Sequence, residues 1–115
     1  MARFLVQIAT GPENPTRAAL GLLFARTAAT EGHDVRVFLA GDAVHLARPE
    51  TASAVQGIGT GPVAEHLEAL RDAGVPLALS GRSSAARGID GNGADLAPPE
   101  RLVELAAWAE TVVTY

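Results

Sequence analysis

A chain of 115 residues without cysteine has the length of one domain, which buries a core without disulfides. Its net charge is −4 and its nine basic residues are all arginines, scattered from Arg3 to Arg101, so nucleic-acid binding through a basic patch is disfavoured. The lack of lysine and cysteine excludes a Walker-A lysine, a Schiff base and thiolate, persulfide or disulfide chemistry. The first apolar run is too short for a signal peptide or a membrane span, so we expect a cytoplasmic protein with no membrane partner.

The first forty residues predict one βαβ unit. Residues 4–9 form a nearly apolar run that is typical of a buried strand. Asn14 is a good helix N-cap with Pro15 at the first helical position, and apolar residues then repeat at helical spacing until Gly32. Residues 35–40 predict the second strand, so the two strands should be parallel and joined by a right-handed crossover.

The segment after the second strand is less regular. Residues 43–47 predict a helical turn that Pro49 breaks, and the glycine-rich residues 56–61 predict a loop that is mobile or covered by a neighbouring subunit. The glycine spacing in this loop does not match a dinucleotide-binding motif, and no strand immediately precedes it. The next helix begins near Pro62, carries an apolar face and ends at Gly74.

The last third of the chain predicts a third strand, a helical turn, a glycine-rich connection, a short fourth strand, a final helix and a C-terminal strand. These elements cover residues 76–79, 83–87, 88–93, 94–97, 98–109 and 111–115. The alternation of strands and helices predicts the α/β class, as a single domain over residues 1–115. We expect a three-layer α/β/α sandwich, of the flavodoxin-like kind, around a mainly parallel sheet of about five strands.

The clearest candidate site follows the third strand. The sequence there is Ser80-Gly81-Arg82-Ser83-Ser84, a polar turn between an apolar strand and a helical turn. At the carboxyl end of a parallel strand, a helix N-terminus offers free N–H groups and a partial positive charge, and an arginine adds a charge-assisted donor. The turn therefore predicts a pocket for a small anion such as phosphate, sulfate, thiosulfate or a carboxylate. The alternative is a capping serine beside a solvent-facing arginine.

Residues that follow the first two strands should share this rim. Thr10, Gly11 and Asn14 follow the first strand, and His45 follows the second. Asn14 is also explained by helix capping alone, and His45 by packing or a subunit contact. Ser80 has no histidine nearby in the sequence to activate it, so a small residue that fits a tight turn is favoured over a nucleophile.

No metal or cofactor site is predicted. The three histidines and thirteen carboxylates form no ligand pattern, because Glu65 and His66 are adjacent and their side chains diverge on a helix. We therefore expect that the protein binds neither a metal nor an organic cofactor.

Three segments, residues 13–18, 37–46 and 80–88, together resemble the DsrE/DsrF/TusD sulfur-relay family over almost the whole chain. The second segment is the most distinctive. Family members often have a strand that ends in phenylalanine-leucine, followed by aspartate-alanine-valine and a leucine two residues later. In that family a cysteine often ends the strand that precedes an arginine-glycine pair; here Ser80 stands at that position, and Arg87 with its following glycine matches the pair.

The resemblance implies a DsrE-like sandwich that assembles into trimers or hexamers, and transfer of sulfane sulfur by the members that carry the cysteine. A serine hydroxyl forms no stable persulfide, so transfer by the thiol route is closed to this chain. We carry over Ser80, Arg82 and Arg87 as pocket positions without a catalytic role. The leading hypothesis is a homo-oligomer that binds a small anion or a sulfur-containing metabolite non-covalently. The alternatives are a scaffold or partner subunit beside a cysteine-bearing relative, and a Ser80-dependent hydrolase.

Overall fold

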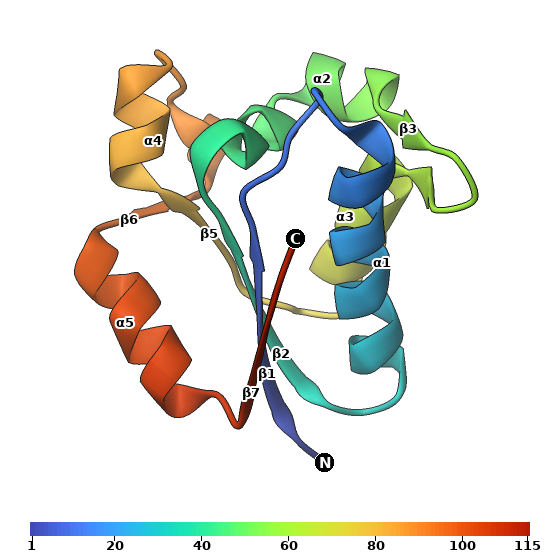
Figure 1. Ribbon diagram of the computed structural model, residues 1–115, viewed down its shortest axis with the longest axis vertical. Helices are drawn as coiled ribbons and strands as arrows, with labels where there is room; N and C mark the ends of the chain where they lie inside the picture. The colour runs from blue at the N-terminus through green and yellow to red at the C-terminus, as the bar shows by residue number, and fades with distance from the viewer.

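A five-stranded parallel sheet forms the centre of the molecule (Figure 1). The computed structural model describes residues 1–115, apart from the side chain of Asn92. The strands lie in the order β6-β5-β2-β1-β7, and every neighbouring pair is parallel, as the sequence predicted. They are β1 (Arg3–Ile8), β2 (Asp34–Leu39), β5 (Leu77–Ser80), β6 (Asp95–Ala97) and β7 (Thr111–Thr114).

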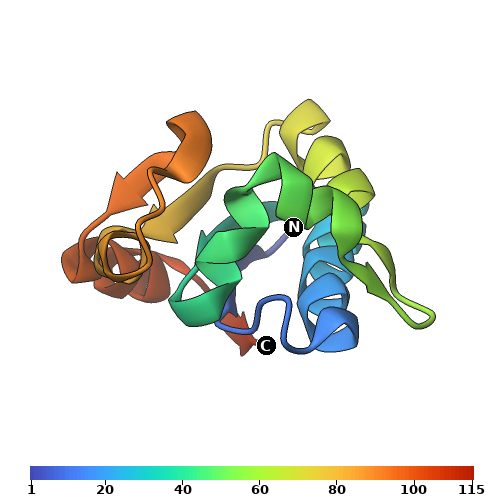
Figure 2. The same cartoon turned by 90° about the horizontal axis from the view of Figure 1, so that it is seen from above.

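Helices cover both faces of the sheet, which confirms the three-layer sandwich. The helices α1 (Pro15–Thr30) and α3 (Val63–Asp72) lie on one face, and α5 (Pro99–Trp108) lies on the other (Figure 1, Figure 2). Above the carboxyl ends of the strands lie the 3-10 helix η1 (Gly41–Ala47) and the short helix α4 (Gly81–Ala86). The remaining elements are α2 (Pro49–Ala54), β3 (Gln56–Gly57), β4 (Gly61–Pro62) and the 3-10 helix η2 (Gly91–Gly93).

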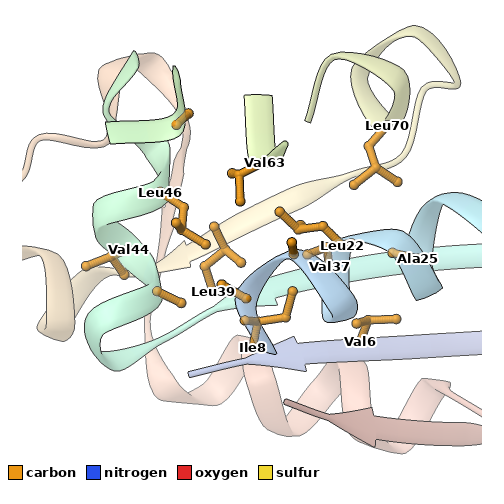
Figure 3. Close-up of a cluster of buried hydrophobic side chains, with 14 of the residues drawn as sticks. Val6, Ile8, Leu22, Ala25, Val37, Leu39, Val44, Leu46, Val63 and Leu70 are labelled. Carbon is orange, nitrogen blue, oxygen red and sulfur yellow. The ribbon is translucent and has the colours of Figure 1, made fainter. Parts of the chain in front are cut away.

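The two faces of the sheet bury very different amounts of apolar surface. Figure 3 shows Val6 and Ile8 of β1 and Val37 and Leu39 of β2 in the larger core, together with Leu22 of α1. Side chains alternate along a strand, so the intervening residues face α5. The buried residues of that second core are only Leu5, Phe38, Ala78 and Ala97. Because α5 buries none of its own residues, the second face is thinly covered.

Small residues let α1 approach the sheet closely. The helix starts as the sequence predicted, because the Asn14 Oδ1 accepts a hydrogen bond from the backbone N–H of Arg17 at 3.2 Å. One turn further along, a Cβ placed on Gly21 would lie 2.9 Å from the Ile8 side chain. The buried alanines of α1 serve the same purpose, because they fill the interface with the sheet without holding the helix away from it.

The helical turn after β2 ends before Pro49, as the sequence predicted, but Pro49 is also the first residue of the unpredicted helix α2, where its missing N–H costs nothing. The expectation of a plain loop at residues 56–61 was wrong, because β3 and β4 form an antiparallel hairpin there. Hydrogen bonds to Thr16 hold this hairpin against α1, from the Ile58 N–H at 3.1 Å and the Thr60 hydroxyl at 3.4 Å. In the part of the chain that the structure describes, no helix is long and apolar enough to cross a membrane.

Candidate functional site

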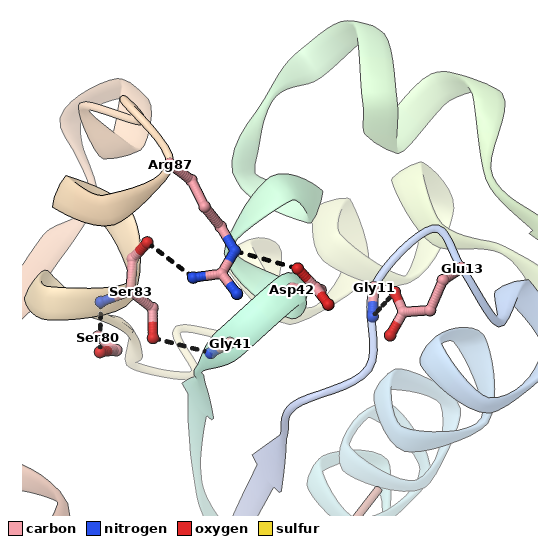
Figure 4. Close-up of polar contacts among 7 residues, drawn as sticks. All are labelled: Gly11, Glu13, Gly41, Asp42, Ser80, Ser83 and Arg87. Atoms are coloured by element: carbon pink, nitrogen blue, oxygen red, sulfur yellow. Dashed lines mark hydrogen bonds and ion pairs between the residues drawn. The ribbon is translucent and has the colours of Figure 1, made fainter.

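The carboxyl ends of β1, β2 and β5 meet at one end of the sheet, where open α/β sheets bind ligands. Three segments lie there: the loop 9–14, η1, and α4 with its caps Ser80 and Arg87 (Figure 4). We call these segments the strand-end rim. Most of the site residues that the sequence predicted lie on this rim, and the contacts between them show which of them act together.

Ser80 and Ser83 are both engaged within the rim. Ser80 ends β5 and is the N-cap of α4, because its Oγ accepts a hydrogen bond from the Ser83 N–H at 3.1 Å. The Ser83 Oγ in turn accepts from the Gly41 N–H at 2.9 Å, which ties α4 to the start of η1. These two contacts join the ends of β5 and β2, which are neighbours in the sheet (Figure 4).

Arg87 lies at the centre of the rim. Its Nε donates to the Asp42 Oδ1 at 3.0 Å, and its Nη1 donates to the Ser83 carbonyl oxygen at 3.1 Å. The side chain of Arg87 is 29% exposed and that of Asp42 is 52% exposed. Two of the three guanidinium nitrogens are therefore fixed, while Nη2 carries neither of these bonds (Figure 4). This arrangement orients the arginine plane before any ligand arrives.

The backbone of Gly11, in the loop after β1, packs closely against the backbone of η1. A Cβ at this position would come closer than 3.0 Å to the Asp42 carbonyl oxygen, so only glycine fits there without a shift. The Gly11 N–H donates to the Glu13 Oε1 at 2.8 Å (Figure 4). Thr10 and Asn14 use their side chains elsewhere: the Thr10 hydroxyl donates to the Tyr115 carbonyl at 3.3 Å, and Asn14 caps α1.

The other predicted site residues lie apart from the Arg87 contacts. Arg82 is exposed and five residues before Arg87, which places it about 140° away around α4. Ser84 is fully buried, and its Oγ has no hydrogen-bond partner among the described residues. His45 is half-buried on η1. Gly81 opens α4.

No histidine among the described residues is hydrogen-bonded to Ser80. The His33 Nδ1 accepts from the Ala2 N–H at 2.9 Å, near the opposite end of β1. The ring of His66 is 4% exposed, with its Nε2 at 2.6 Å from the Thr60 carbonyl and its Nδ1 at 3.4 Å from the Arg26 Nη1. A carbonyl only accepts, so the Nε2 carries the proton, and both ring nitrogens are occupied.

Sequence reasoning missed Gly41, Asp42 and Glu13 as parts of the rim. A signal for the first two was present, because they directly follow the second strand and therefore lie at the same sheet end as Ser80. Among the described residues, no three histidine, cysteine or carboxylate side chains are arranged to hold a metal ion.

The fold is similar to that of known protein structures. The chain is similar to the YchN protein of E. coli in its crystal structure, with a TM-score of 0.78 and 24% identity over 100% of both chains. It is also similar to BT1422 of Bacteroides thetaiotaomicron, described as a conserved protein of unknown function, with a TM-score of 0.72 and 12% identity over 99% of this chain and 95% of that one. No curated protein sequence matches the chain. The chain has no cysteine. The model of the DsrE/DsrF-like family matches residues 2–115, so the chain belongs to this family.

Proposed function

We propose that this protein binds a small anion non-covalently at the strand-end rim, with Arg87 as the anchor. The observation that carries the proposal is the guanidinium group that Asp42 and Ser83 hold in one orientation. When an anion displaces the Asp42 carboxylate, Nε and Nη2 of Arg87 form a fork of donors that matches the oxygens of sulfate, thiosulfate, phosphate and carboxylates. The chain has no cysteine, so charge and hydrogen bonds hold the ligand instead of a persulfide bond.

The carboxylate of Asp42 occupies the position beside the Arg87 guanidinium that a bound anion would take. Because this side chain is about half exposed, its ion pair with Arg87 contributes only about 0–1 kcal/mol. An oxyanion with two negative charges therefore competes with the singly charged carboxylate for the same guanidinium at low cost. Arg82, exposed on α4 but turned away from the Arg87 contacts, adds only a longer-range positive charge to this end of the molecule.

The test is a titration of ¹⁵N-labelled protein with sodium thiosulfate, sulfate and phosphate at constant ionic strength. We expect saturable shifts at the rim of the wild-type protein and weaker binding, by about tenfold, in Arg87→Gln. Asp42→Asn should bind severalfold more tightly, because it removes the competing charge. Arg17→Gln is the control for the lost charge, since Arg17 is an exposed arginine on α1 and takes no part in the contacts among Arg87, Asp42 and Ser83. An equal response of all four proteins refutes the proposal.

A second candidate function is that of a subunit that associates with copies of itself or with a cysteine-bearing relative. The thin cover of the α5 face favours it, because Val103 of α5 is 69% exposed and Val112 of β7 is 43% exposed. Apolar side chains exposed on one layer are typical of interfaces. Light scattering after size exclusion tests this function: Val103→Glu should lower the measured mass of an oligomer. A monomeric wild-type protein at high concentration, with no heteromer in its own host, removes this candidate.

A further inference from the structure

An apolar cavity lies on the α3 face of the sheet, away from the strand-end rim. Its walls come from α3, the end of β2, the start of β5 and η2, and its volume is about 270 Å³. Its lining includes four leucines, of which Leu39 and Leu70 are buried and Leu67 and Leu77 are half-buried. We infer that this cavity binds a small carboxylic acid with an aliphatic or aromatic body.

The size of the cavity is the first argument. An apolar cavity of about 150 Å³ is already enough to take up benzene. At about 270 Å³, this cavity has room for an apolar body of about six to eight carbon atoms.

Arg71 supplies the second argument, because it decides the charge of the ligand. Among the described residues that line the cavity, Arg71 alone is charged. It is exposed in the last turn of α3 and forms no ion pair with any residue in the described part of the chain. The other arginines that line cavities on this protein differ, since Arg36, Arg48 and Arg101 each have a carboxylate partner.

An apolar wall with one unpaired guanidinium at its edge complements an amphipathic monocarboxylate. The hydrocarbon body packs against the leucines and removes the half-buried Leu67 and Leu77 from water, and the carboxylate pairs with the fork of Arg71. A dianionic phosphate lacks the apolar body, and an amine has the wrong charge.

The experiment is a titration of the ¹⁵N-labelled full chain with sodium octanoate, with octylamine as the probe of opposite charge. We expect saturable shifts at the cavity residues with octanoate and none with octylamine. Arg71→Gln should weaken octanoate binding by about tenfold. Arg17→Gln, the matched exposed arginine, should bind as the wild type does.

A second variant tests the cavity independently of charge. Leu67→Trp fills the space from a half-buried position of α3 and should abolish the octanoate shifts. The inference is overturned if octanoate gives no saturable shift, if octylamine binds equally well, or if Arg71→Gln keeps wild-type affinity. Arg87→Gln should leave octanoate binding unchanged, so this inference and the anion proposal for the strand-end rim fail separately.

Discussion

The substitution Gly11→Ala tests how tightly the strand-end rim is packed. Gly11 is buried and does not have a positive φ, so alanine is compatible with its backbone conformation. The obstacle is space alone, because the added Cβ would come closer than 3.0 Å to the backbone oxygen of Asp42. A backbone oxygen held in η1 cannot rotate away as a flexible side chain does. One of the two segments must therefore shift.

We expect Gly11→Ala to cost about 3 kcal/mol of the free energy of unfolding, at the upper end of the range for overpacked sites. The matched control is Gly59→Ala, where the φ of +76° is strained for alanine but no atom lies within 4 Å of the added Cβ. That control should cost about 1 kcal/mol. Urea unfolding of the three proteins measures both values. If Gly11→Ala loses no more stability than Gly59→Ala, the close contact between the two loops is not as rigid as argued.

Three further predictions concern single contacts. Asn14→Ala removes the N-cap of α1 and should cost about 1 kcal/mol in urea unfolding; an unchanged midpoint would show that the cap adds nothing. Ser83→Ala leaves the Gly41 N–H without its acceptor and should cost about 1–2 kcal/mol by the same measurement, whereas Ser83→Thr, which keeps the hydroxyl, should cost less. The pKa of the Glu50 carboxyl lies below its usual value, because of a backbone hydrogen bond in the first turn of α2 and then because of Arg48. The small stability that this carboxylate contributes is therefore present above the usual glutamate pKa and is lost as the pH falls through the lowered pKa. An NMR titration that gives Glu50 a pKa at or above the usual glutamate value contradicts this prediction.

The fold could be predicted from local patterns because the main elements carry strong signals of their own. Asn14 followed by Pro15 marked the start of α1, and the nearly apolar runs at residues 4–9 and 35–40 marked buried parallel strands. The hairpin of β3 and β4 could not be predicted this way. Each of its strands has only two residues, and its position depends on hydrogen bonds to Thr16, about forty residues earlier in the chain.

The site, too, was predicted where neighbouring residues decide the structure and was missed where contacts between distant segments decide it. Ser80, Ser83 and Arg87 were predicted as site residues, but Asp42 and its contact with Arg87 were not. Asp42 and Arg87 are 45 residues apart, and their contact depends on the sheet register that places β2 beside β5. His66 was considered only as a metal ligand next to Glu65. Its spacing of three residues from Val63 and four from Leu70 places it on the apolar face of α3, and that signal could have predicted its burial.

The unequal cover of the two sheet faces has a consequence for local unfolding. Elements with few buried side chains open at a lower free energy than the core of a protein. The helix α5 buries none of its residues, and β7 follows it at the edge of the sheet, paired only with β1. In a monomer, the backbone amides of α5 and β7 therefore exchange with solvent through openings that leave β1, α1 and β2 intact. We therefore expect opening of the native state to begin in the segment from α5 to β7.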